Sequence, residues 1–268
     1  MGHKALAFIR RDFQTQASYR LDFLMRIAGM LISVSIFFFI SDMLGTAVNP
    51  YLESYGADYF HFALMGLAFY PLIEISVNSM SRAVHESQGN GTLEVLFLSP
   101  TPIVAALVMS NLWTYCWAFA QSIFCLLTAS LLFGAHLDWA NILNVVVVVL
   151  TAILANAGLA LLNASFVLVT KRSSPVATLL SMVTGMLAGV YYPVEVLPIW
   201  LRSVGRLLPA THAFDALRRI MLKSASLADI GTQLLALAVL TLVLLPVGLI
   251  AFRWAVRWAK MDGSLSQY

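Results

Sequence analysis

Residues 142–170 read Ile142-Leu-Asn-Val-Val-Val-Val-Val-Leu-Thr-Ala-Ile-Leu-Ala-Asn-Ala-Gly-Leu-Ala-Leu-Leu-Asn-Ala-Ser-Phe-Val-Leu-Val-Thr170, without a single charged side chain. A helix needs about 20 predominantly apolar residues to cross a hydrocarbon core of about 30 Å, and this stretch is longer than that. It is therefore predicted to be a transmembrane helix, and it places the chain among the all-α membrane proteins.

The composition of the whole chain agrees with this stretch. Of the 268 residues, 60% are hydrophobic and only 11% are charged, and the mean hydropathy is +0.84. A soluble domain carries roughly 25% charged residues, so the composition excludes a soluble protein and predicts an integral membrane protein. The formal net charge of +3 does not indicate a nucleic-acid partner, because the basic residues flank apolar segments instead of forming one patch.

Working outward from residues 142–170, the chain is predicted to be one polytopic transmembrane domain over residues 1–268. Each predicted span is an apolar run bounded by polar or charged residues. The six spans cover residues 27–44, 60–80, 103–133, 142–170, 176–192 and 234–252.

Residues 4–22 precede the first span and carry apolar side chains at helical spacing. This pattern predicts an amphipathic helix that lies along the cytoplasmic membrane surface. A soluble N-terminal helix is the alternative interpretation. The apolar positions are Leu6, Ile9, Phe13, Ala17 and Leu21.

Lys and Arg residues are concentrated in alternate connections. They occur in the N-terminal segment, in the connections after the second and fourth spans, and in the C-terminal tail, whereas loops 45–59 and 134–141 hold none. Basic connections remain on the cytoplasmic side of a membrane. Both termini are therefore predicted to be cytoplasmic, in a multi-pass protein of the cell (inner or plasma) membrane.

The connection 193–233 breaks this rule, because it is predicted to lie outside and yet is basic. Pro193, Pro198 and Pro209 interrupt its apolar pattern. We expect residues 193–215 to form re-entrant helices in the outer leaflet, where irregular backbone must be shielded by protein or line a wet cavity. A seventh crossing is the alternative, and the prolines count against it. The basic residues are Arg202, Arg206, Arg218, Arg219 and Lys223.

A polar stretch, Glu86-Ser-Gln-Gly-Asn-Gly-Thr-Leu-Glu94, separates the second and third spans. It belongs to a segment, residues 82–100, that is predicted to form one short helix carrying Arg82, His85, Glu86 and Gln88. Gly89 and Gly91 are expected to end that helix in left-handed backbone conformations. Charged faces beside a sharp turn suit docking on a cytoplasmic partner, and an ordinary solvated loop is the alternative.

This segment resembles the cytoplasmic coupling segment of ABC-2-type transporter permeases, in which a short helix followed by Gly-Thr-Leu-Glu docks on an ATPase subunit. A second resemblance to the same family is Tyr191-Tyr-Pro-Val-Glu-Val-Leu-Pro198, continued by Leu207-Leu-Pro-Ala-Thr-His-Ala-Phe-Asp-Ala-Leu-Arg218. It looks like the family's segment after the fifth span. The two motifs, their order and the six spans extend the resemblance over essentially the whole chain. The residues that the resemblance assigns to ATPase coupling are Arg82, His85, Glu86, Gly91, Thr92 and Glu94.

The resemblance implies the permease subunit of an ABC exporter, paired with a second copy or a related permease and surrounded by membrane lipids. It also implies two separate P-loop ATPase chains, which would bind ATP and Mg. This chain holds no G-x-x-x-x-G-K-[ST] phosphate loop, so it is expected to be neither an enzyme nor a cofactor-binding subunit. Residues 19–26 stand where polysaccharide-exporting relatives carry Leu-Gly-x-x-Trp, which favours the drug- or lipid-type branch and a hydrophobic or amphipathic substrate.

Glu74 is the only carboxylate well inside a predicted span. A charged acid there costs about a few kcal/mol unless it is paired or wet, so it is a functional candidate. One alternative is packing against polar groups such as Asn111 or Gln121; another is an ion-coupled secondary transporter or channel that uses Glu74 without an ATPase. The predicted substrate path or gate comprises Tyr70, Glu74, Asn78, Tyr191, Tyr192, Pro193, Glu195 and Pro198.

Small residues and possible metal ligands complete the sequence-based expectations. Gly185 and Gly189 form a G-x-x-x-G pattern in the fifth predicted span, which predicts close helix packing. Asn156 and Asn163 are predicted to bridge helices from the fourth span. The five His residues show no metal-ligand spacing, and no metal site is expected.

Overall fold

The computed structural model describes residues 20–93, 102–170 and 175–261. All regular secondary structure in these ranges is helical, which confirms the all-α class. The predicted interfacial helix, residues 4–22, lies outside the described residues except at its end, where residues 20–22 already belong to the first long helix.

Five helical stretches in the described ranges are long and apolar enough to cross a membrane, which confirms a multi-pass membrane protein. The predicted fourth span is reproduced at both ends, whereas the second and sixth predicted spans are each part of a longer helix. The stretches are α2 (Arg20–Leu44), α4 (Tyr59–Gly89), α6 (Ile103–Ser110) continued by α7 (Leu112–Phe133), α8 (Ile142–Thr170) and α12 (Gly231–Met261).

The fifth predicted span, residues 176–192, is a shorter helix than expected. Helix α9 (Pro175–Leu187) has 13 residues and is about 20 Å long, less than the hydrocarbon core of about 30 Å. The chain then turns at Gly189, whose φ is +75°. Gly185 and Gly189 therefore do not share a helical face, so the predicted G-x-x-x-G packing motif is wrong, and the six-span count stays a prediction.

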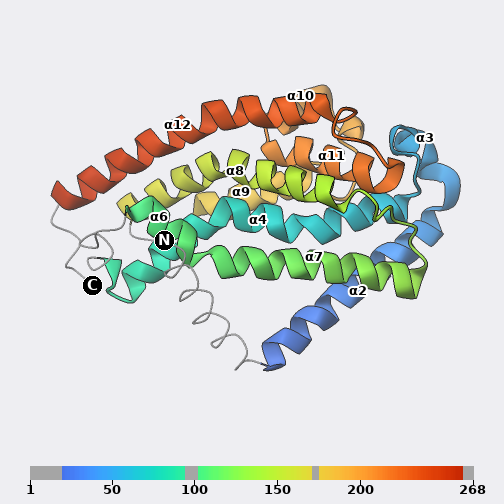
Figure 1. Ribbon diagram of the computed structural model, residues 1–268, viewed down its shortest axis with the longest axis horizontal. Helices are drawn as coiled ribbons and strands as arrows, with labels where there is room; N and C mark the ends of the chain where they lie inside the picture. The colour runs from blue at the N-terminus through green and yellow to red at the C-terminus, as the bar shows by residue number, and fades with distance from the viewer. Residues whose placement is uncertain (1–19, 94–101, 171–174, 262–268) are drawn as a thin grey trace.

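Short helices form one end of the molecule, where α3 and α11 lie in Figure 1. Residues 193–215 do contain short helices, and the last of them, α11, runs on past the predicted boundary. Pro198 and Pro209 stand at the two helix starts, where a missing N–H costs nothing. Their depth in a membrane stays a prediction. The elements are η1 (Gly45–Val48), α3 (Asn49–Leu52), η2 (Glu53–Tyr55), η3 (Val194–Val196), α10 (Ile199–Gly205) and α11 (Pro209–Lys223).

Helix α4 is the centre of the bundle. Figure 1 shows α12, α8, α4 and α7 side by side, with α2 crossing them obliquely, and α9 and α11 also contact α4. In the membrane-spanning window of α4, 67% of the residues are buried, against 6% in α2 and 11% in α12. The outer helices therefore present apolar side chains outward, while α4 carries its polar residues inside the protein.

Helices α8 and α12 cross at two glycines that leave their backbones in contact. A Cβ atom on Gly158 would lie 2.3 Å from the carbonyl carbon and oxygen of Leu244. A Cβ atom on Gly248 would lie 2.4 Å from the carbonyl oxygen of Gly158. Small residues allow such close approach between membrane helices, so these two positions fix the α8–α12 crossing.

Candidate functional site

Tyr70, Glu74 and Asn78 follow one another at four-residue spacing, so they lie on one face of α4. This face meets α9. The Tyr70 hydroxyl donates to the backbone oxygen of Ser181 at 3.1 Å. The Asn78 amide Nδ2 donates to Ser181 Oγ at 2.5 Å and to Glu74 Oε1 at 3.4 Å. The structure therefore brings the three predicted residues together, and it adds Ser181 from α9.

Two asparagines of α8 bridge to α4, and one of them, Asn163, joins this network. Asn163 Nδ2 donates to Asn78 Oδ1 at 3.3 Å, and Asn156 Nδ2 donates to Ser76 Oγ at 2.9 Å. This confirms that the two asparagines bridge helices. The partners suggested from sequence for the Glu74 region, Asn111 and Gln121, are not in the network. Asn111 Nδ2 instead donates to the Leu107 carbonyl one turn back at 2.7 Å, which closes the break between α6 and α7.

Glu74 lies midway along α4 and is only partly buried, whereas Asn78 is 7% exposed. One carboxylate oxygen of Glu74, Oε1, accepts the hydrogen bond from Asn78. A partly open carboxylate among amide and hydroxyl groups can bind a polar part of a passing molecule or hold a proton. A charged carboxylate in hydrocarbon is costly unless it is paired or in contact with water, so a role of Glu74 in a substrate path stays a prediction.

The C-terminal end of α4 carries the residues predicted to couple to an ATPase. Arg82, His85 and Glu86 are exposed on its last turns, as is Thr92 after it. These side chains lie on α4 itself, so the predicted separate short helix is wrong in its first half. The last part of that segment, residues 94–100 with Glu94, lies outside the described residues.

The turn after α4 is built differently from the prediction. Gly91 has φ +64° and is left-handed as expected, whereas Gly89 is still helical. Gln88 is 3% exposed, because the helical repeat places it on the buried face. The Thr92 N–H donates to the Ser87 carbonyl at 3.0 Å. The turn is thus held onto the helix.

Leu93 fastens this turn to the bundle. It is 3% exposed and belongs to a cluster that includes Val84 of α4, Leu107 of α6 and Phe252 of α12. The exposed charged side chains at the end of α4 are therefore carried by a segment whose other face is packed into the core. Arg82 and Glu86 lie on α4 itself, so a displacement of these residues would also displace the helix.

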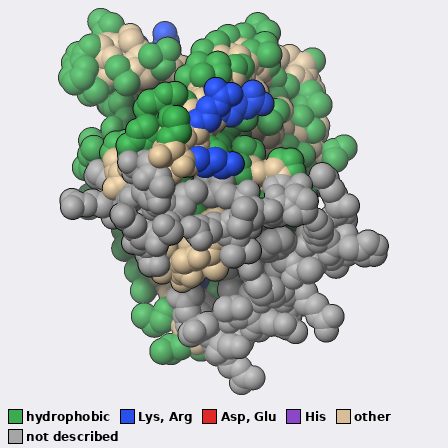
Figure 2. Space-filling model, turned by 90° about the vertical axis from the view of Figure 1, so that its left-hand side faces the viewer, with side chains coloured by type: hydrophobic (Ala, Val, Ile, Leu, Met, Phe, Trp, Pro, Cys, Tyr) green, Lys and Arg blue, Asp and Glu red, His purple; other side chains and the backbone are tan. Residues whose placement is uncertain are grey.

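The end of the molecule formed by the last turns of α4 and α12 is basic, and it is called the basic end below. Figure 2 faces this side of the molecule and shows Lys and Arg side chains gathered on it. Arg253, Arg257 and Lys260 are exposed on one face of α12. Trp254 lies beside them, and its exposed fraction is 63%. Aromatic and basic residues of this kind mark the interface of a membrane with water.

The predicted outer gate lies at the opposite end of α4. The Tyr191 ring stacks on Phe37 of α2, with centroids 5.5 Å apart and an angle of 9° between the planes. The Tyr192 hydroxyl donates to the Met186 carbonyl at 2.6 Å. Pro193 is buried, and Glu195 and Pro198 are exposed. Arg202 donates to the backbone carbonyls of Glu195 and Leu197, which closes this segment into a compact turn.

Arg218 of α11 is a key residue that the sequence interpretation did not assign to the site. It is 2% exposed, and its guanidinium carbon lies 3.6 Å from the centroid of the Phe62 ring. Its Nε donates to the Phe62 carbonyl at 3.2 Å, and its Nη2 donates to the Val190 carbonyl at 3.0 Å. Burial lowers the pKa of Arg218 to about 10, while Tyr55 and Asp215 raise it, so the group stays charged at neutral pH.

Arg218 therefore ties the outer turn to the start of α4. The two backbones also touch there, because a Cβ atom on Gly66 would lie 1.9 Å from the Val190 carbonyl oxygen. Nearby Asp215 accepts from Arg219 Nε at 3.2 Å and from Gln233 Nε2 at 2.6 Å, which joins α11 to α12. The outer turn, the start of α4 and the start of α12 thus form one unit.

Helix α4 links all three groups of candidate residues. Phe62 and Gly66 contact the outer turn, Glu74 lies midway, and Arg82 and Glu86 project from the basic end. From Phe62 to Arg82 the helix rises about 30 Å. Among the residues that the structure describes, no group of three or more His, Cys, Asp or Glu side chains could hold a metal ion.

Comparison with known proteins bears on this geometry. Residues 4–222 match the family described as ABC-2 type transporter. The linearmycin resistance permease protein LnrN of Bacillus subtilis (strain 168) is 30% identical over 105 residues. That similarity spans 39% of this chain and 27% of the relative.

Proposed function

Since the chain belongs to the ABC-2 type transporter family, we propose that it is the membrane subunit of an exporter driven by two separate P-loop ATPase chains. The family match over residues 4–222 carries this proposal. The sequence holds no phosphate-binding loop of its own, so ATP and Mg would bind on the ATPase chains. Transport, and not catalysis, is the role of this chain.

The exposed end of α4 is the proposed contact with the ATPases. ATP binding would draw the two ATPases together and move Arg82, His85 and Glu86. Because Leu93 packs this end into the core, the motion would pass into α4 as a whole. It would then shift the Glu74 face and the turn held by Arg218, which is the proposed outer gate.

The proposed substrate is a hydrophobic or amphipathic molecule that moves outward along the Glu74 face. A bundle of this size encloses little space for a substrate. We therefore propose that the substrate path is completed by a second copy of the chain or by a related permease. Helices α2 and α9 offer apolar surface to such a partner: Phe39 and Met182, for example, are 66% and 62% exposed. The similarity to a resistance permease supports export as the direction.

The proposed orientation places the basic end in the cytoplasm, and both termini with it, in the cell (inner or plasma) membrane. Lys and Arg favour the cytoplasmic side of membrane proteins. The last turns of α4 and α12, which carry the exposed coupling residues and the exposed basic residues, lie at the same end (Figure 1), which is what an ATPase in the cytoplasm requires.

Glu86→Lys tests the coupling contact. Reversing the charge of an exposed interface residue creates like-charge contacts, and a change of about 2 kcal/mol corresponds to a loss of roughly thirtyfold in affinity. We expect the variant to reach the membrane in normal amounts, to lose the co-purifying ATPase and to lose stimulated ATP hydrolysis. Glu53→Lys, the same change at an exposed residue of the other end, is the matched control. Equal loss of the ATPase in both variants would argue against docking at α4.

Glu74→Gln tests the proposed path. The glutamine retains an oxygen that accepts from Asn78, so the fold is expected to persist. Loss of the charge should lower transport about tenfold, the effect of one charged hydrogen bond of about 1.5 kcal/mol. Ser181→Ala is the control, since it removes another partner of Asn78 and leaves the carboxylate, and transport should stay within about twofold. Equal losses in the two variants would mean that the network only supports the fold.

A further inference from the structure

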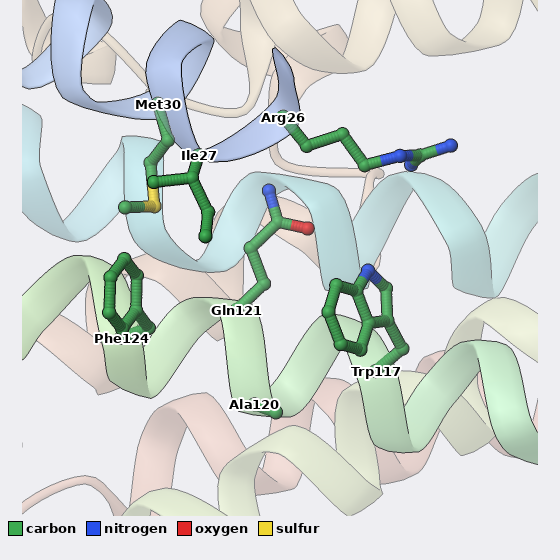
Figure 3. A pocket seen from close by; sticks show the side chains of 7 residues that line it. All are labelled: Arg26, Ile27, Met30, Trp117, Ala120, Gln121 and Phe124. Carbon is green, nitrogen blue, oxygen red and sulfur yellow. The ribbon is translucent and has the colours of Figure 1, made fainter. Parts of the chain in front are cut away.

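A cavity of about 220 Å³ lies between α2 and α7 and belongs to none of the sites described above. Figure 3 shows Gln121 of α7 pointing toward α2 between the two helices, with Arg26 and Trp117 to one side of it and Met30 and Phe124 to the other. The lining is therefore almost wholly apolar, and the Arg26 guanidinium extends past its rim on the side of Trp117. The remaining lining residues are Ile27 and Ala120.

The position of the cavity along α7 places the rim with Arg26 near a membrane surface. Trp117 lies 16 residues before Phe133, the last residue of α7, and so about 24 Å along the helix from that end. Phe124 lies about 14 Å from it by the same measure. In a hydrocarbon core of about 30 Å, Trp117 and the Arg26 guanidinium are close to the interface on the side of the basic end, and Phe124 is inside the core.

This arrangement matches the two parts of a lipid. Trp and Arg side chains at the interface contact headgroups, and basic pockets between membrane helices bind anionic ones. Ile27, Met30 and Phe124 continue from there into the hydrocarbon as an apolar wall. Small-molecule sites usually measure about 300–1,000 Å³, so this smaller cavity suits part of one acyl chain, with the headgroup outside it at the rim.

Helix α2 leaves the cavity accessible from the bilayer. Only 6% of its membrane-spanning window is buried in the protein, and Arg26 itself is exposed. Charge selects among the lipids that can enter, because a guanidinium attracts a headgroup with net negative charge more strongly than a zwitterionic one.

We propose that the cavity between α2 and α7 binds an anionic phospholipid of the leaflet at the basic end, with the headgroup at Arg26 and one acyl chain along Met30 and Phe124. Binding does not depend on an ATPase or on transport. Only the identification of this leaflet as the cytoplasmic one rests on the proposed function. The test below therefore remains informative even where the transport proposal fails.

Native mass spectrometry of the purified chain tests this site. The protein is released from micelles that contain equal amounts of phosphatidylglycerol and phosphatidylcholine, and the retained lipids are counted. The wild type is expected to retain one phosphatidylglycerol per chain in preference to phosphatidylcholine. Arg26→Gln should lower that preference about fivefold, the effect of one basic residue near a charged surface.

Two further variants separate the cavity from general surface charge. Ala120→Phe fills the cavity from α7 and should abolish retention of the bound lipid, whatever its headgroup. Arg253→Gln removes an exposed arginine that also stands beside a tryptophan, on α12, and should leave the preference unchanged. Thermal unfolding of each variant confirms that it is folded.

Three results would overturn the proposal. Equal effects of Arg26→Gln and Arg253→Gln would show a general attraction of lipid to basic residues. Full retention by Ala120→Phe would place the lipid elsewhere. A wild-type chain that retains no phosphatidylglycerol would show that another occupant, such as the N-terminal segment or a second copy of the chain, covers the cavity.

Discussion

Gly158→Val is expected to reduce the yield of folded protein at least about tenfold. The new Cβ atom would lie 2.3 Å from the Leu244 carbonyl group, and a backbone carbonyl cannot move aside as a side chain does. Helices α8 and α12 would have to separate along their most extensive contact. Overpacking a core costs about 1–3 kcal/mol and sometimes more, a large share of a typical stability of about 5–15 kcal/mol.

The measurement is the amount of monodisperse protein recovered in detergent by size-exclusion chromatography. Gly29→Val is the matched control, because a Cβ atom on this glycine of α2 meets nothing within 4 Å. Its recovery should equal that of the wild type. If the two variants behave alike, contact between the α8 and α12 backbones does not determine the stability of the bundle.

Arg218→Met is expected to lower the free energy of unfolding by roughly 3 kcal/mol. Methionine has similar length, but it cannot donate to the Phe62 and Val190 carbonyls, and each hydrogen bond from a charged donor contributes about 1.5–3 kcal/mol. It also loses the cation–π contact with the Phe62 ring. Because these contacts hold the outer turn on α4, we further expect substrate to leak through the closed transporter.

Arg219→Met is the control for this variant. Arg219 is the next residue of α11, and its side chain is 39% exposed where it pairs with Asp215. A partly exposed ion pair contributes about 0–1 kcal/mol, so this change should be mild. Denaturant titration of both variants in detergent gives the comparison. Similar destabilisation by the two changes, or none by Arg218→Met, would contradict the assigned role of the buried arginine.

The parts of the fold that the sequence predicted well depend on length and spacing along the chain. An uncharged run such as residues 142–170 has to be a membrane helix, and α8 begins and ends where predicted. Four-residue spacing was enough to place Tyr70, Glu74 and Asn78 on one face. These inferences need no knowledge of which helix packs against which.

Some of the errors concern where helices end, and the others concern contacts between helices. Ser181 and Asn163 were not recognised as partners of Asn78, because the neighbours of α4 are fixed by the packing of the whole bundle. Gly158 and Gly248 lie on different helices and make no local motif, whereas the motif at Gly185 fails because the chain turns at Gly189. The sequence did contain a signal for Arg218. It is a basic residue in connection 193–233, which the predicted orientation places outside, where few basic residues are expected.

The central claim is that a separate ATPase drives this chain. Gentle affinity purification of the tagged protein, followed by identification of its partners and an assay of ATP hydrolysis, tests it most directly. The account predicts a stoichiometric P-loop ATPase that hydrolyses ATP in the recovered complex. Recovery of the chain alone, together with Glu74-dependent ion or substrate flux in liposomes that lack ATP, would contradict it and favour an ion-coupled transporter or channel.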